Sequence, residues 1–158
     1  MRRAALRLQL ALEQVAELTA RIRELAQAAG LEPLTQVCGI SLLTAAALAG
    51  ILGPGQRFAS DADLAAYAGA APLEASSAGA VRHRLNRGGN RKLNAILHRI
   101  AVTQAGHPSD GRAYLDRRRA DGKSTREAIR ALKRYLVRRI WHLWVQILAN
   151  TPRLSAPI

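Results

Sequence analysis

The chain has 158 residues, enough for one compact domain with a helical extension, and it carries a net charge of +13 at pH 7. Its single cysteine excludes an internal disulfide and a zinc site built from cysteines, as expected for the reducing cytoplasm. No apolar run reaches the roughly 18 residues that span a membrane, so we expect no membrane partner. The abundance of Ala and Leu favours a mainly all-α fold.

The first predicted element is a helix over residues 3–29, a stretch without glycine or proline. Apolar side chains recur there every three or four positions, which predicts an amphipathic helix with one apolar stripe: Leu8, Leu12, Val15, Leu18, Ile22 and Leu25. Two interpretations are open, half of a coiled coil that makes a homo-oligomer, or packing on the chain's own domain. We divide the chain into a coiled-coil-like connector at 1–30, a domain at 31–150 and a tail at 151–158.

A helical hairpin is predicted next. Residues 34–37 fit a short helix, Gly39 a tight turn, and Ser41 the cap of an Ala-rich helix that runs to Ile51. This order resembles a helix-hairpin-helix element, whose turn amides can hold a DNA phosphate. An ordinary helical hairpin fits equally well, because the turn carries little charge of its own.

A loop with two adjacent serines, Ser76 and Ser77, follows a short helix capped by Ser60. Phe58 and Tyr67 are predicted to be core residues. No strand pattern stands out in this part of the chain, and only residues 80–84 favour extended backbone.

Three further helices are predicted, over 89–103, over 110–120, and from the capping box of Ser124 and Glu127 to about residue 150. In the first, Leu93, Ile96, Leu97 and Ile100 face inward, and Arg91, Lys92 and Arg99 face outward. In the last, the buried stripe is Ile129, Leu132, Leu136, Ile140, Leu143 and Ile147, and the outer side carries Arg126, Arg130, Lys133, Arg134 and Arg138. Trp141 and Trp144 are interpreted as packing residues.

The whole charge excess lies in residues 82–139, which hold seventeen basic and four acidic side chains. Arginine outnumbers lysine there by fourteen to three. Arginine forks match phosphate oxygens in a bidentate way. Because the excess spans loop and helix together, it indicates a nucleic-acid-binding surface.

The serine loop has two chemical interpretations. It is a turn that positions a phosphate, or it carries a nucleophile for a phosphodiester, with basic side chains to stabilise the developing charge. His83 is a candidate acid or base. The acidic residues form no metal-binding pattern, so no metal or other cofactor is predicted in this chain.

Four motifs occur in order: "RFASDADLAAYAGAAP" at 57–72, "SSAG" at 76–79, "RLNRGGNRKLN" at 84–94 and "GKSTREAIRALKR" at 122–134. On these motifs, residues 34–144 resemble the C-terminal transposase domain of the insertion-sequence-110 (IS110/IS116/IS902) family. That family includes Piv-type DNA invertases and recombinases guided by a bridge RNA.

The resemblance implies an enzyme of two parts: an RNase H-like domain whose carboxylate tetrad binds Mg²⁺, and a domain with a serine that attacks DNA. Ser77 best matches the family serine, which usually precedes a glycine directly. Since Ala78 intervenes before Gly79, Ser76 stays an alternative. Cys38 stands where the family turn usually has proline.

DNA and a structured guide RNA are the implied partners. The residues expected to bind nucleic acid are Arg82, Arg84, Arg87, Asn90, Arg91, Lys92, Arg117, Arg118, Arg119, Lys123 and Arg126. We expect a transposase fragment that lacks the carboxylate domain and is inactive without it, with Mg²⁺ bound only by that other domain. A catalytically inactive DNA- or RNA-binding remnant is the alternative.

Overall fold

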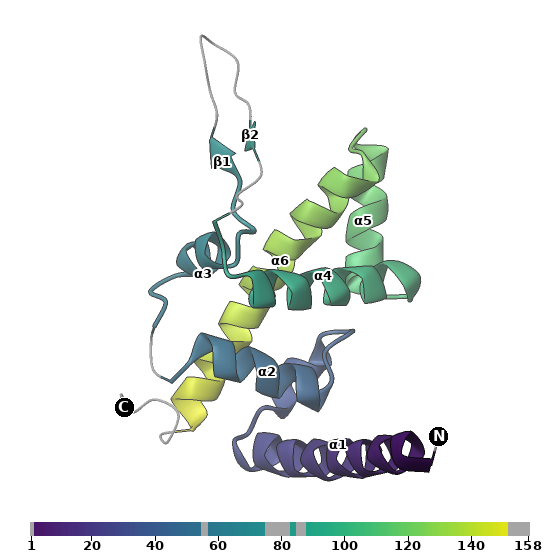
Figure 1. Ribbon diagram of the computed structural model, residues 1–158. Coiled ribbons are helices and arrows are strands. Elements are labelled where there is room, and N and C mark those ends of the chain that lie inside the picture. Colours follow the sequence, from purple (N-terminus) through teal and green to yellow (C-terminus); the bar gives the residue numbers. More distant parts are fainter. Residues whose placement is uncertain (1, 55–56, 75–82, 85–87, 152–158) are drawn as a thin grey trace.

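The computed structural model describes residues 2–54, 57–74, 83–84 and 88–151. Those residues form six α-helices, one 3-10 helix and two very short strands (Figure 1). In chain order they are α1 (Arg2–Ala28), η1 (Glu32–Gln36), α2 (Leu42–Leu52), α3 (Asp61–Tyr67), β1 (Leu73–Glu74), β2 (His83–Arg84), α4 (Arg91–Gly106), α5 (Asp110–Ala120) and α6 (Thr125–Asn150). The mainly all-α prediction is confirmed.

The core is built around α6, the long helix that crosses the domain and packs against α3, α4, α5 and η1 (Figure 1). The predicted stripe is confirmed, since five of its six members are buried and Ile129 is half-buried. Trp144 is buried and Trp141 half-buried, which confirms packing roles for both. Each fully buried leucine or isoleucine stabilises the fold by about 1.5–3 kcal/mol.

The predicted helix caps are confirmed. The Ser41 hydroxyl accepts a hydrogen bond from the backbone amide of Thr44 at 3.3 Å, and the Ser60 hydroxyl accepts one from the backbone amide of Asp63 at 3.2 Å. Ser124 and Glu127 form the reciprocal capping box, with Ser124 N donating to Glu127 Oε2 at 2.9 Å. Helix α4 begins two residues later than predicted, because Asn90 is its N-cap, and extends to Gly106.

Helix α1 lies at the edge of the domain beside α2 (Figure 1), and its apolar stripe is exposed. The six stripe side chains are 41–63% exposed, and Ala26 is the buried residue of this helix in the described chain. Packing of the stripe on the chain's own domain is therefore wrong.

The hairpin of η1 and α2 is held against α4. Gly39 has a φ of +87°, and a side chain at this position would place its Cβ 3.2 Å from the Cβ of Thr103. The buried Gln104 donates from Nε2 to the carbonyl of Cys38 at 2.8 Å. These contacts favour the ordinary structural hairpin over a turn that is free to bind phosphate.

Strands β1 and β2 form an antiparallel pair that projects from the helical domain (Figure 1). Leu73 pairs with Arg84, and Glu74 pairs with His83. The extended backbone predicted for 80–84 is confirmed at residues 83–84, and residues 80–82 lie outside the described chain. None of the helices in the described part of the chain is both long and apolar enough to cross a membrane.

Candidate nucleic-acid interface

Several predicted site residues lie beyond what the structure describes. Ser76, Ser77, Arg82 and Arg87 fall outside the described residues, and of Arg84 only the backbone, in β2, is described. Residues 75–82, which include both serines, connect β1 to β2. We call the pair of β1 and β2 the ribbon, and the residues on either side of it, 67–72 and 88–90, its foot. These described residues show how the segment between β1 and β2 is attached to the domain.

The foot of the ribbon is fastened by the motif that follows it. A Cβ at Gly89 would overlap the backbone of Gly69, so the two chain segments meet at a glycine pair. Asn90 N donates to the carbonyl of Tyr67 at 2.6 Å, and Asn90 Nδ2 donates to the Tyr67 hydroxyl at 2.8 Å. Asn94 Nδ2 donates to the carbonyl of Ala68 at 2.7 Å. The "GGN" and the last asparagine of the motif thus join both ends of the ribbon to α4.

Asn90 was predicted to bind nucleic acid, but its side chain is engaged within the protein. Besides its bond to Tyr67, its Oδ1 accepts from Leu93 N at 2.9 Å and caps α4. Its role in the described structure is to hold the ribbon, and its contact with nucleic acid stays a prediction.

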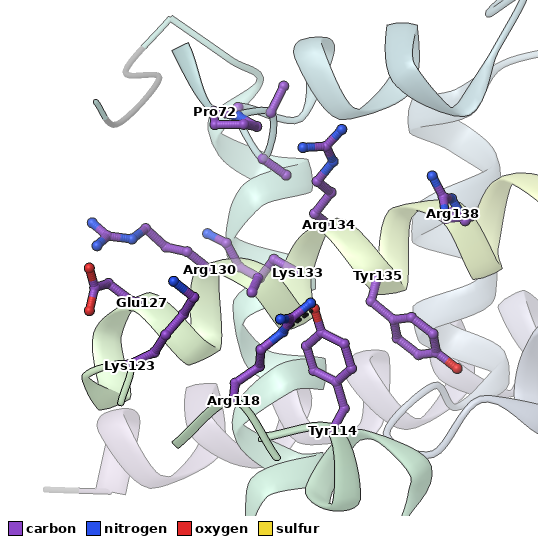
Figure 2. A pocket seen from close by; sticks show the side chains of 14 residues that line it. Pro72, Tyr114, Arg118, Lys123, Glu127, Arg130, Lys133, Arg134, Tyr135 and Arg138 are labelled. Atoms are coloured by element: carbon purple, nitrogen blue, oxygen red, sulfur yellow. Dashed lines mark hydrogen bonds between the residues drawn. The ribbon is translucent and has the colours of Figure 1, made fainter. Parts of the chain in front are cut away.

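A groove of about 630 Å³ opens beside the foot of the ribbon (Figure 2). One wall is the segment 69–72 that leads into β1, and the others come from α5, α6 and the turn between them. Six cationic side chains and one carboxylate, Glu127, line it; the cations are Arg118, Lys123, Arg130, Lys133, Arg134 and Arg138. We call this the cationic groove.

A row of arginines runs along α6 at four-residue spacing: Arg126, Arg130, Arg134 and Arg138, all exposed as predicted. Arg138 donates from Nε to Asp61 at 2.8 Å, whereas Arg130 and Arg134 make no ion pair with the described residues. Like charges four residues apart repel one another on a helix, by a few tenths of a kcal/mol per pair. The repulsion within this row destabilises the helix on its own, and a bound polyanion would neutralise the charges and remove it.

Arg118 is held in the groove by Tyr114 and by an ion pair with Asp121 at 3.4 Å. Its Nε donates to the hydroxyl of Tyr114 at 3.1 Å, and its guanidinium lies 5.1 Å from the centre of that ring. Tyr114 in turn stacks on Tyr135, with ring centroids 5.3 Å apart. The hydrogen bond to Tyr114 raises the pKa of Arg118; arginine is in any case charged at neutral pH.

The prediction that Lys133 lies on the outer side of α6 is wrong. Its side chain is only 8% exposed, because it lies one turn from Ile129 and from Val137 on the side of α6 that packs on α4. Its Nζ donates to Asn94 Oδ1 at 2.8 Å. Burial, followed by the neighbouring charge of Arg130, lowers the pKa of Lys133.

The remaining predicted cations divide between the groove and the outer surface. Lys123 lines the groove with Arg118, whereas Arg117 and Arg119 are exposed on α5 outside it. Arg119 pairs with Asp116 at 3.5 Å. Arg91 and Lys92 are exposed in the first turn of α4, where the helix dipole disfavours cations in the absence of an anionic partner.

Four groove cations were missing from the predicted site: Arg130, Lys133, Arg134 and Arg138. The spacing of the arginines was a usable signal, since residues four apart share one face of a helix. Lys133 offered no such signal, because its partner Asn94 is 39 residues away in the sequence. Among the described residues, no group of three or more His, Cys, Asp or Glu side chains could hold a metal ion.

Two comparisons with known proteins bear on this site. The model of the "Transposase IS116/IS110/IS902 family" matches residues 31–116, which include the hairpin, the ribbon and α4. The "Insertion element IS110 uncharacterized 43.6 kDa protein" of Streptomyces coelicolor is 38% identical over 124 residues. Those residues are 77% of this chain and 31% of the relative, so the chain spans about a third of the relative's length.

Proposed function

Because the chain belongs to the IS116/IS110/IS902 transposase family, we propose that it is the part of a transposase that holds DNA and presents a serine nucleophile for strand exchange. The observation that carries the proposal is the cationic groove at the foot of the ribbon whose connection contains Ser76 and Ser77. A DNA backbone in this groove would pass beside residues 69–72, the segment that leads along the chain into β1.

Phosphate recognition would come from the groove. Its arginine forks can hold phosphate oxygens in a bidentate way, and binding releases counterions from the DNA. Such contacts position a duplex without reading its sequence. Choice of the target and donor DNA is therefore assigned to a structured guide RNA, as the family resemblance implies.

Ser77 is the proposed nucleophile, with Ser76 as the alternative. Its Oγ would form a bond to phosphorus while one bridging P–O bond of the strand breaks. The serine proton passes to a base, and the leaving oxygen takes up a proton. The product is a transient phosphoserine link, which a hydroxyl of the receiving strand displaces to free the serine.

Magnesium does not fit the described residues, since their carboxylates form no cluster that could bind it. The proposal therefore places Mg²⁺ in an RNase H-like domain that acts together with this one.

We further propose that the exposed stripe of α1 pairs with a second copy of the chain as a coiled coil. The protein is also proposed to work in the cytoplasm.

The test is covalent trapping on a nicked duplex from the ends of the element, with guide RNA, Mg²⁺ and an RNase H-like domain of a relative supplied in trans. A protein–DNA adduct that is lost in Ser77→Ala but kept in Ser76→Ala supports the proposal. Loss in Ser76→Ala alone moves the nucleophile by one residue. Salt-sensitive DNA binding with no adduct from any combination of halves would instead identify an inactive nucleic-acid-binding remnant.

A further inference from the structure

Lys133 is a buried cation without a carboxylate partner among the described residues. Its Nζ has one described hydrogen bond, to the neutral amide oxygen of Asn94. The carboxylate that lines the same groove, Glu127, is committed to its capping box, where it accepts from Ser124 N and Ser124 Oγ at 2.9 and 2.6 Å. A buried charge is costly unless an opposite charge compensates it.

The surroundings of this lysine have the chemistry of an anion site. Asn94 Nδ2 is bound to the carbonyl of Ala68, which leaves its Oδ1 directed at the ammonium group. One of the three ammonium protons is used in this way, and two remain for a ligand. Arg130 and Arg134 line the same groove from the same helix, and neither makes an ion pair with a described residue. Figure 2 shows these three cations on the stretch of α6 that borders the groove.

We propose that Lys133 anchors one phosphate of a nucleic-acid backbone in the cationic groove, with Arg130 and Arg134 as flanking forks. The inference rests on the proposed DNA-binding function and adds the position of one phosphate. It favours a phosphate over the carboxylate of a protein partner, because the groove presents six cations and only one acid, as a polyanion requires. A bound phosphate would also offset the burial that lowers the pKa of Lys133.

One side chain, Asn94, would link the bound phosphate to the backbone that leads into β1. Asn94 holds Lys133 with its Oδ1 and Ala68 with its Nδ2. Ala68 precedes the 69–72 wall and β1, so Lys133 and the foot of the ribbon are linked through the Asn94 side chain. Lys133 is thus a positioning residue, which would fix the DNA backbone relative to residues 69–72.

The first test uses NMR of the intact chain, with its three lysines, Lys92, Lys123 and Lys133, labelled with ¹³C at Cε. The probes are dithymidine monophosphate, inorganic phosphate, thymidine and hexaglutamate. We expect the dinucleotide to move the Lys133 signal saturably and several-fold more than the Lys92 signal, with no shift from thymidine. A Lys133 signal that stays still while a DNA duplex binds would overturn the inference. An equal or larger response to hexaglutamate would overturn it too.

The second test compares Lys133→Met with Arg139→Met, which removes one charge from an exposed position of α6 outside the groove. Methionine keeps the apolar stem, and melting curves confirm that each variant is folded. We expect Lys133→Met to weaken duplex binding on the order of tenfold and the control by less than threefold. If both variants lose the same amount of affinity for the duplex, the inference about Lys133 is refuted, but the proposal that the chain binds DNA still stands. Absence of DNA binding by the unaltered chain would instead refute the proposed function itself.

Discussion

Replacing Arg130 and Arg134 together by glutamine is expected to flatten the salt dependence of DNA binding. Both side chains line the cationic groove and make no ion pair with the described residues, so neither is neutralised before DNA arrives. Each phosphate that a cation neutralises adds about 0.9 to the slope of log affinity against log salt. Loss of two such contacts therefore lowers the slope by about 1.8.

The magnitude follows from the groove. Its four cations without a described ion pair are Lys123, Arg130, Lys133 and Arg134, and they contribute a slope of about −3.6 if each meets one phosphate. Between 50 and 200 mM salt this part of the affinity falls about 150-fold, and in the double variant only about 12-fold. Basic residues elsewhere on the chain add the same amount to both proteins.

The assay is fluorescence anisotropy of a labelled duplex over that salt range. The matched control is Arg3→Gln with Arg7→Gln, which removes the same charge from exposed positions on α1. The control should keep the slope of the unaltered chain. If the groove variant keeps its slope, or if the control changes as much, the assignment of the groove as the phosphate-binding surface is refuted.

Three further outcomes are expected. Gly89→Ala should destabilise the domain by about 2 kcal/mol or more in urea unfolding, because its Cβ has no space, whereas Gly50→Ala, in an open helical position, should stabilise it by about 0.5–1 kcal/mol. If both alanines behave alike, the glycine contact at the ribbon foot is not as described. The hydrogen bond from Arg138 lowers the pKa of Asp61. This pair therefore stabilises the fold above about pH 4, and the stabilisation is lost as the pH falls through the lowered pKa. The melting-temperature difference between the unaltered chain and Asp61→Asn should therefore be constant from pH 7 to 5 and vanish towards pH 2; a difference that persists in acid would contradict this cause. Leu18→Gln should leave the melting temperature of the domain unchanged, since this side chain is 62% exposed, but should reduce the oligomer fraction in sedimentation; an unchanged fraction would count against α1 as the dimer contact.

Local signals in the sequence predicted the helices well. Serine caps and a three-to-four residue apolar repeat depend only on neighbouring residues, so Ser41, Ser60 and the Ser124–Glu127 box could be identified directly. The buried face of α6 followed from the same repeat. The location of the basic excess likewise indicated the region that forms the cationic groove.

Contacts between distant segments could not be predicted in this way. In the sequence, Lys133 is one of three basic residues in "RALKR" and nothing distinguishes it from the other two. It lies beside Asn94 only because α6 packs on α4. The roles of Gly89 and Asn94 likewise depend on where residues 67–69 cross α4. Helical periodicity assigns a residue to a face, but tertiary packing decides which faces are covered.

The most direct test of the central claim, that the cationic groove is the DNA-binding surface of a transposase domain, is photo-crosslinking of the intact chain to a duplex from the ends of the element. Crosslinked peptides are mapped by mass spectrometry at a salt concentration that removes weak contacts. If the groove binds DNA, crosslinks form in 69–72 and in 114–138, on its walls. Crosslinks confined to α1 and α2, with the groove peptides unmodified, would contradict it.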